Sequence, residues 1–370
     1  MENSKKICCI FNLGPHYNYP LYVEMSKELH CDFYIGDHLP YFIKTFEYNS
    51  LPNFKGTLRN KFLHNFYWQV GAIKLLFKPY HTYIMTGEPY CLSHWILLIL
   101  SKFTKKRMIA WTHGWYGRET TLKKTIKKAF FHLFNHILSY NEYAIQLMEK
   151  EGFDRKKMTC IANSLDSDRI KLIRQQLKDT DIFSQHFGNT NPVLIYCGRI
   201  QKSKQIDMII DSIERMNNED FKVNFVIVGK DVEQTGLSEY VNKKHLQEQV
   251  WFYGACYDDA ILGELFYNAT VCVSPGNVGL TAIHALSFGC PVVTHNNFAY
   301  QGPEFEAIIP NYTGDYFQQG NIEDLTNKIR KWAQRNNIER AQTRQIAFKE
   351  IERKWDIHQQ IKTLQTIITA

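Results

Sequence analysis

Two basic side chains stand close together in the stretch CGRIQKSK, residues 197–204. Arg199 and Lys204 follow an apolar run that predicts a β-strand, and a turn separates them. A planar guanidinium and a compact ammonium together suit a diphosphate. The stretch is not a P-loop, because Ser203 stands where that loop needs glycine and Gln205 where it needs a hydroxyl. Spacing alone favours a diphosphate site no more than a solvated basic turn.

A loop of small residues follows a later apolar strand, in SPGNVGLTAIHALSFGCPVV at residues 274–293. Backbone N–H groups and the helix dipole attract anions where such a loop enters a helix. Thr281 and His284 are three residues apart, so we expect them to share one helix face. Such turns are common, and a lone helical histidine is more often a packed group than a ligand contact. The candidate anion site comprises Gly276, Asn277, Val278, Gly279 and Leu280, and further candidate binding residues are Gly198, Thr281 and His284.

Two predicted strands in the first half also end in polar residues. His113 ends a strand in AWTHGW, where it could reach a ligand. Gly14, Pro15 and His16 form a tight loop after the first strand and are candidates for the acceptor side of a substrate site.

Short apolar strands alternate with helical patterns along the whole chain, which is typical of parallel α/β sheets. In such sheets ligands bind beyond the carboxyl ends of the strands, where all these candidates lie. A polar segment with Gly188 and Pro192 divides the pattern. We therefore expect a first lobe at 1–178, a linker at 179–192, a second lobe at 193–345 and a last helix at 346–370. The expected strands are 6–13, 31–36, 82–87, 107–114, 193–199, 223–230, 249–255, 270–275 and 291–296.

Composition narrows the class of protein. The 370 residues are 44% hydrophobic with a mean hydropathy of -0.35, which indicates a soluble protein. The longest apolar stretch, WILLIL at 95–100, is too short to span a bilayer. The N-terminus lacks the layout of a signal peptide. Nine cysteines without a C-x-x-C pair favour reduced thiols in the cytoplasm over disulfides or a zinc site.

Charge is distributed unevenly. Residues 1–175 carry 25 Lys and Arg against 14 Asp and Glu, and the remainder carries 19 against 23. The basic half should meet a phospholipid surface, nucleic acid or a polyphosphate, but no nucleic-acid-binding motif accompanies it. Residues 118–138 predict an amphipathic helix that either lies on an anionic membrane or packs its apolar stripe on the sheet. Its basic residues are Lys123, Lys124, Lys127 and Lys128.

The order of these motifs resembles the retaining glycosyltransferases of family GT4, also called glycosyltransferase group 1. The sequence carries GR-x4-K, then VIVGK, WFYGA and the loop at 274–293, followed by GPE at 302–304 and TGDYF at 313–317. NSLD at 163–166, KWD at 354–356 and WTHG are further similarities. The resemblance covers about residues 107–360. It implies the GT-B fold, with two Rossmann-like lobes facing across a cleft and a C-terminal helix that returns to the first lobe.

The resemblance also implies roles. Arg199 and Lys204 would bind the donor diphosphate, the loop would hold sugar and phosphate, and His113 would face the donor sugar. The donor would be a nucleotide-sugar, with UDP or GDP expected, and no metal or other cofactor is implied. The acceptor would be a lipid-linked glycan of a capsule or lipopolysaccharide. We expect a cytoplasmic enzyme that contacts the inner face of the cell membrane.

The chain departs from the family at one motif. The family's two glutamates, separated by seven residues, align with Gly276 and His284. A neutral imidazole can accept one hydrogen bond and donate one, so it could still hold a ribose. An unusual donor, a variant subfamily or lost activity would each explain the change, and the intact cations favour the variant. The alternatives to transfer are a nucleotide-sugar 2-epimerase of the same fold and a nucleotide-sugar-binding scaffold without turnover.

Overall fold

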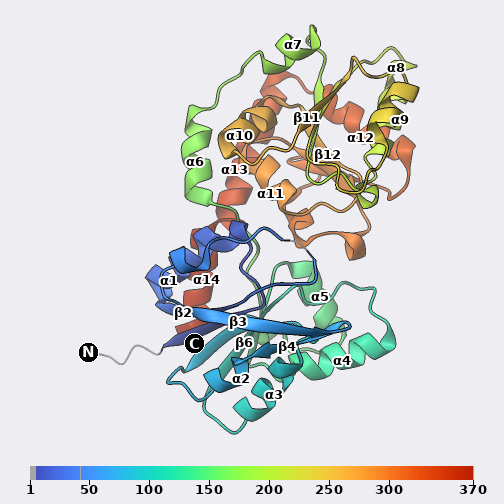
Figure 1. Cartoon of the computed structure of the whole chain (residues 1–370). Helices are drawn as coiled ribbons and strands as arrows, with labels where there is room; N and C mark the ends of the chain where they lie inside the picture. The colour runs from blue at the N-terminus through green and yellow to red at the C-terminus, as the bar shows by residue number, and fades with distance from the viewer. Residues whose placement is uncertain (1–5, 42, 370) are drawn as a thin grey trace. The chain divides into compact units, whose positions relative to one another are not determined.

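The computed structural model describes residues 6–41 and 43–369, which form two compact units (Figure 1). Unit 1 comprises the described residues up to Asp166 together with those from Ile357 on, and unit 2 is Ser167–Asp356. The segment 179–192, expected as a linker, lies inside unit 2 and includes helix α7 (Ile182–Phe187). Gly188 in this segment ends helix α7 in the left-handed conformation, with φ 66°, which glycine adopts more readily than other residues.

Unit 1 is built on an eight-stranded sheet with the order β4-β3-β2-β1-β5-β6-β7-β8. Neighbouring strands are parallel except β3 and β4, which form an antiparallel hairpin that the sequence did not reveal. The sheet is therefore mixed, where a purely parallel one was expected. Its strands are β1 (Ile7–Phe11), β2 (Cys31–Gly36), β3 (Phe54–Leu63), β4 (Phe66–Val70), β5 (Thr82–Thr86), β6 (Arg107–Thr112), β7 (His136–Ser139) and β8 (Met158–Cys160).

Helices cover both faces of this sheet and bury an apolar core on each. The last helix, α14, packs against α1 and buries Ile361 and Leu364 among the strand residues of one core, as the fold requires. It begins at Ile357, whereas the sequence suggested residue 346. The helices of unit 1 are α1 (Tyr19–Leu29), α2 (Ala72–Leu75), α3 (Leu92–Ser101), α4 (Thr121–Phe131), α5 (Glu142–Lys150) and α14 (Ile357–Thr369).

The expected amphipathic helix at 118–138 is only partly helical. Helix α4 ends at Phe131, and the chain turns and enters strand β7 five residues later, at His136. Ile137, assigned to the apolar stripe, is therefore buried in a strand, while Leu122 on α4 is 71% exposed. Apolar residues at helical spacing misled the prediction. Phe130 and Ile137 are both buried, but Phe130 lies on helix α4 and Ile137 on strand β7.

Unit 2 has a six-stranded sheet, all parallel, with the order β11-β10-β9-β12-β13-β14. Its strands are β9 (Val193–Cys197), β10 (Asn224–Val228), β11 (Val250–Gly254), β12 (Val271–Ser274), β13 (Val292–His295) and β14 (Gly314–Phe317). Its remaining helices are α6 (Ser167–Gln176), α8 (Asp207–Asn217), α9 (Leu237–Lys243), α10 (Asp259–Asn268), α11 (Leu280–Ser287), α12 (Ile322–Ala333) and α13 (Asn337–Lys354). Short 3-10 turns are η1 (His16–Asn18), η2 (Tyr48–Ser50), η3 (Arg155–Lys157), η4 (Lys202–Lys204), η5 (Phe298–Tyr300) and η6 (Pro303–Ala307).

Each sheet has a point where the strand order reverses. In unit 1 this point lies between β1 and β5, and in unit 2 between β9 and β12. Loops that leave the carboxyl ends of such strand pairs diverge to opposite faces of the sheet and open a crevice. Gly14 follows β1, Arg199 follows β9 and the loop from Gly276 follows β12, whereas His113 follows β6, the neighbour of β5. Across the described ranges, 6–41 and 43–369, no helix is both long and apolar enough to cross a membrane.

Candidate functional site

The two predicted diphosphate ligands follow strand β9 in unit 2. Arg199 is exposed, and its guanidinium has no hydrogen bond or ion pair within the described part of the chain. Lys204 ends η4, and its Nζ donates to the carbonyl oxygen of Asn277 at 2.8 Å and to its Oδ1 at 2.9 Å. Burial and the nearby Arg199 charge lower the pKa of Lys204 to about 8. The structure thus brings two cations together with the loop after β12.

Hydrogen bonds from other segments hold the loop Gly276–Leu280 in place. Gly276 N donates to Lys204 O at 3.0 Å, and Val278 N donates to Gln301 Oε1 at 2.7 Å. A Cβ on Gly276 would lie 2.3 Å from the carbonyl oxygen of Ser203, so no side chain fits there. A glutamate at this position, which the resemblance implies, would therefore meet the backbone of Ser203. Helix α11 begins directly after Gly279 without a side-chain cap, which leaves its first N–H groups available to an anion.

Thr281 and His284 of α11 contact different elements, although the sequence suggested one shared face. Thr281 Oγ1 donates to the carbonyl oxygen of Cys197 at 3.0 Å and ties α11 to the end of β9. The ring of His284 packs against Phe266, and its Nε2 lies 3.5 Å from a carboxylate oxygen of Asp259 on α10. Burial outweighs that carboxylate and lowers the pKa of His284 to about 4, so the imidazole is neutral near pH 7.

A buried carboxylate beside the loop was not selected from the sequence. Glu304 is 4% exposed in η6, and its Oε2 lies 3.9 Å from the position that a Cβ on Gly279 would occupy. Its charge raises the pKa of Lys204 against the effect of burial. The GPE stretch at 302–304 was the available signal, but the sequence did not show that its glutamate faces the loop.

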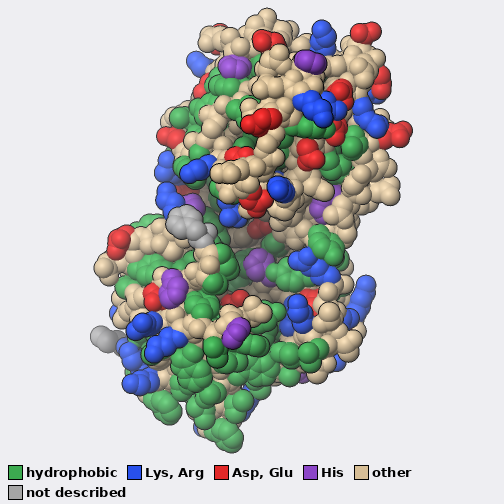
Figure 2. All heavy atoms as spheres, turned by 45° about the vertical axis from the view of Figure 1, so that its right-hand side comes forward, with side chains coloured by type: hydrophobic (Ala, Val, Ile, Leu, Met, Phe, Trp, Pro, Cys, Tyr) green, Lys and Arg blue, Asp and Glu red, His purple; other side chains and the backbone are tan. Residues whose placement is uncertain are grey.

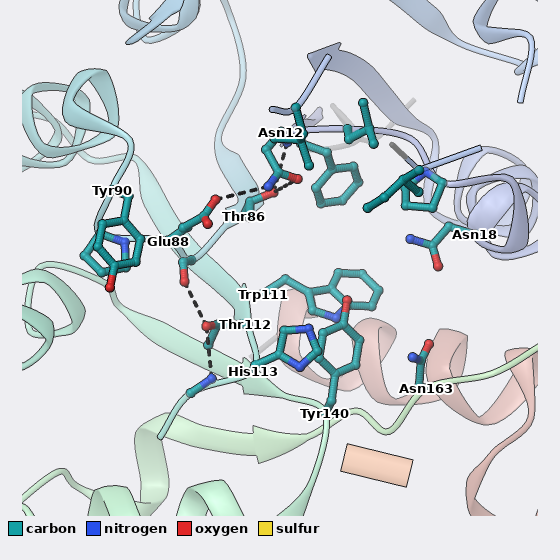
Figure 3. A pocket seen from close by; sticks show the side chains of 18 of the residues that line it. Asn12, Asn18, Thr86, Glu88, Tyr90, Trp111, Thr112, His113, Tyr140 and Asn163 are labelled. Carbon is teal, nitrogen blue, oxygen red and sulfur yellow. Dashed lines mark hydrogen bonds between the residues drawn. The ribbon is translucent and has the colours of Figure 1, made fainter. Parts of the chain in front are cut away.

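Unit 1 contains a cavity of about 630 Å³ at the carboxyl ends of its central strands (Figure 3). Asn12 follows β1, Glu88 follows β5 and His113 follows β6, so the point of reversed strand order builds its wall. The aromatic rings of Trp111 and Tyr140 form another part of that wall. Flat apolar rings beside hydrogen-bonding groups suit a sugar, which has both C–H and hydroxyl surfaces.

Glu88 is the carboxylate of this cavity, and its orientation is set by two donors. Asn12 Nδ2 donates to Glu88 Oε2 at 3.1 Å and Tyr67 OH donates to the same atom at 3.0 Å. The backbone N–H of Asn12 donates to Thr86 Oγ1 at 3.1 Å, which fixes the loop after β1. Within the described residues Oε1 of Glu88 receives no hydrogen bond, so it is available to a ligand hydroxyl.

His113 lies where the sequence placed it, at the end of β6 and in the cavity wall. Solvent reaches its ring from the cavity, yet protein surrounds it, and this burial together with Lys127 lowers its pKa to about 4. The ring centroid is 4.7 Å from that of Tyr140. Thr112 Oγ1 accepts from Gly114 N at 3.0 Å and stabilises the turn. The geometry presents a neutral imidazole to any ligand in the cavity.

Of the predicted acceptor-side loop, only Pro15 is among the cavity-lining residues. Gly14 has a packing role, because its N–H donates to Tyr48 OH at 3.1 Å and a Cβ would lie 2.9 Å from the ring of Phe46. His16 is exposed, with Nδ1 3.1 Å from the carbonyl oxygen of Lys44. The preceding Asn12, which was not selected, carries the polar contact instead.

The four lysines expected on one membrane-facing helix surface are divided by the structure. Lys127 is 13% exposed, pairs with Glu119 at 2.7 Å and donates to the carbonyl oxygen of Gly114 at 2.6 Å. It therefore supports the cavity wall, and Lys123 lines the cavity. Lys124 pairs with Glu151 at 2.5 Å, and Lys128 is exposed. Residues i and i+4 share a face, so the two pairs point in different directions.

No group of three or more His, Cys, Asp or Glu side chains that could hold a metal ion occurs within ranges 6–41 and 43–369. Metal independence stays a prediction.

Comparison with known proteins identifies a family for part of the chain. Residues 178–350 match the model of the family described as glycosyl transferases group 1. No curated protein sequence matches the chain.

Several solved structures have the same fold over nearly the whole chain. A glycosyltransferase from Rickettsia africae ESF-5 is 15% identical with a TM-score of 0.75, over 99% of this chain and 98% of that one. HepE of Anabaena in complex with UDP is 14% identical with a TM-score of 0.71, over 98% and 99%. The lipopolysaccharide outer core galactosyltransferase WaaB is also 14% identical, with a TM-score of 0.69 over 98% and 99%. The chain therefore has the GT-B fold, and its residues 178–350 match the glycosyl transferases group 1 family.

Proposed function

We propose that this protein is a glycosyltransferase that moves a sugar from a nucleotide-sugar to a hydroxyl acceptor with retention at the anomeric carbon. The observation that carries the proposal is the pair Arg199 and Lys204 beside the loop Gly276–Leu280, in the unit that matches the family. Both cations stand at the reversal of strand order in unit 2, where this sheet type binds its ligands. A UDP-sugar is the donor we favour, since a protein of the same fold, HepE, binds UDP and UDP-glucose.

The chemistry follows from charge. When the bond between sugar and diphosphate breaks, negative charge grows on the leaving oxygen. Arg199, Lys204 and the uncapped start of α11 place positive charge around that oxygen before the reaction begins. The leaving diphosphate can itself accept the proton of the incoming hydroxyl, so no protein nucleophile is needed. The carboxylate of Glu88 would orient the acceptor in the cavity of unit 1, whose wall also presents the neutral imidazole of His113.

The cavity favours transfer over 2-epimerisation of a free nucleotide-sugar. A separate space of about 630 Å³ in unit 1, with an oriented carboxylate and aromatic walls, provides room for a second substrate. We propose a lipid-linked glycan of a surface polysaccharide as that substrate. Two observations support this acceptor. Unit 1 has a net positive charge, and the fold is shared with the lipopolysaccharide outer core galactosyltransferase WaaB.

Calorimetric titration with UDP, GDP, dTDP, ADP and CMP tests the donor site. We expect one preferred nucleoside diphosphate, bound at least tenfold more weakly by Arg199→Ala because one charge-assisted contact is lost. Lys202→Ala is the matched control, since Lys202 is an exposed neighbour in the same turn. Equal affinity of the wild type and the Arg199 variant would remove the diphosphate assignment. Proton NMR of the product's anomeric signal, from transfer with the preferred donor, tests retention.

A further inference from the structure

The outer face of the β3–β4 hairpin is apolar and basic. Cross-strand neighbours on this face are Arg59 with Val70, Lys61 with Trp68, and Leu63 with Phe66. Leu63 is 69% exposed, and Phe66, Trp68 and Val70 are exposed as well, while Tyr67 and Gln69 between them are buried. The outward positions of this hairpin hold aromatic and aliphatic side chains. Such an exposed apolar surface is typical of a site that contacts a membrane or another protein.

Helix α3 continues this surface. It buries Leu97 and Leu98 against the sheet, yet its opposite side is also apolar. A surface helix normally turns polar residues outward, and a helix that is apolar all round is expected in a core or in a membrane. Phe103, just after α3, is 84% exposed, and Phe77, just after α2, is 79% exposed.

The hairpin and α3 form one face. Tyr67 N donates to Tyr90 O at 3.0 Å, and the rings of Phe66 and Tyr90 are 6.1 Å apart, which joins β4 to the start of α3. Figure 2 shows hydrophobic side chains gathered over the part of unit 1 where Figure 1 has β4, α2 and α3. We call this surface the apolar face: Leu63, Phe66, Trp68, Val70, Phe77, Tyr90, Leu92, Ile96, Ile99, Leu100 and Phe103.

The charged residues of the segment that carries the apolar face are nearly all basic. Residues 59–107 contain a single acidic residue, Glu88, which lies in the cavity and is held there by Asn12 and Tyr67. Six cations of the same segment are exposed and form no ion pair with a carboxylate in the part of the chain that the structure describes. They are Arg59, Lys61, Lys74, Lys78, Lys102 and Lys105.

We propose that the apolar face docks the protein on a membrane that contains anionic lipids. Aromatic rings suit the level of the lipid headgroups, and lysines beside them reach phosphates while their stems cover apolar surface. Each such cation strengthens binding to an anionic surface about fivefold. A second copy of the chain fits less well, because a symmetric contact would bring these unpaired cations against one another. The apolar face belongs to unit 1 and shares no residue with the proposed donor site in unit 2.

Flotation of the purified chain with vesicles tests the proposal. We expect binding to phosphatidylglycerol–phosphatidylcholine vesicles and at least tenfold weaker binding to pure phosphatidylcholine. The triple variant Ile96→Ser, Ile99→Ser, Phe103→Ser removes apolar contact without touching the core, and should weaken binding at least tenfold. Lys61→Gln with Lys102→Gln should weaken it about fivefold for each cation.

Matched controls separate this surface from general charge. Lys222→Gln with Lys243→Gln removes two exposed cations of unit 2 and should leave binding unchanged. Lys124→Gln with Lys128→Gln tests α4, and a large loss there with none in the triple variant would overturn the assignment.

The fluorescence of Trp68 can report how deeply the apolar face enters the lipid layer. Vesicles with brominated acyl chains should quench tryptophan fluorescence in the wild type, and much less in Trp68→Phe. Light scattering gives the oligomeric state of the same samples. A dimer that the triple variant converts to monomer, with no vesicle binding by either, would show that a second copy covers the apolar face and would refute membrane docking.

Discussion

The lowered pKa of Lys204 predicts that the proposed nucleotide binding depends on pH in a range where an ordinary lysine does not titrate. An ordinary lysine titrates near 10.4, but burial and Arg199 bring the pKa of Lys204 to about 8. The protonated fraction of this group in the free protein then falls from about 0.9 at pH 7 to about 0.1 at pH 9. If a diphosphate binds the ammonium form, its affinity should fall about tenfold over this interval, or about 1.4 kcal/mol.

Calorimetry with UDP at pH 7, 8 and 9 and constant ionic strength would measure this slope, provided that UDP is the nucleotide bound. Lys204→Arg is the matched control, since arginine stays charged throughout and should give a nearly flat profile. The phosphate itself titrates below pH 7 and contributes little to the slope. A wild-type profile as flat as that of the arginine variant would show that Lys204 does not meet the diphosphate as an ammonium.

Other predictions concern the loop, the cavity and a buried histidine. Gly276→Glu should lower unfolding stability by about 1–3 kcal/mol and weaken nucleotide binding, because its Cβ would lie 2.3 Å from Ser203 O; thermal unfolding with and without nucleotide would show both effects, and an unshifted melting temperature would contradict the packing argument. Glu88→Gln should abolish saturation-transfer NMR signals from methyl glycosides in unit 1 while nucleotide affinity stays the same, and retained signals would remove the carboxylate from the acceptor site. Burial lowers the pKa of His295 to about 4 in the folded protein, whereas the unfolded chain titrates near 6.5. The free energy of unfolding should therefore be constant above pH 6.5 and fall by up to about 3 kcal/mol as the pH falls toward 4. Chemical denaturation from pH 7 to 4 would measure this loss, which should shrink in His295→Gln.

The alternation of apolar strands and helices was enough to predict most of the fold. Strand β2 has the predicted bounds, because a buried strand leaves a strong local pattern. The β3–β4 hairpin was not predicted, since its apolar residues face outward and do not follow the rule of burial. Helix α4 was extended too far, because residues of strand β7 continued its spacing by chance.

Polar residues of the candidate site could be predicted where they directly follow the end of an apolar strand. Arg199, Lys204 and His113 lie beside the expected strands for this reason. Glu88 was missed although it follows β5, because nothing in TGEPY shows that Asn12 and Tyr67 orient its carboxylate. Such long-range contacts arise only from packing.

The space beside Gly276 could not be predicted from the sequence either. A sequence shows glycine at position 276 but not that the turn at Ser203 fills the space beside it. His284 was predicted to share a face with Thr281, yet helical spacing does not reveal which neighbouring helix receives each side chain.

Helix α14 affects the order in which the units can fold during synthesis. It supplies Ile357, Ile361, Leu364 and Ile367 to a core of unit 1 that β1 and β2 begin to form, and the ribosome makes these residues after all of unit 2. Unit 2 is continuous in sequence, so it can complete its core first. Until then helix α1 covers only part of that side of the sheet, and the rest of its apolar surface stays exposed. Growth of the chain therefore exposes the N-terminal sheet to aggregation and to chaperones for longer than the half that follows it.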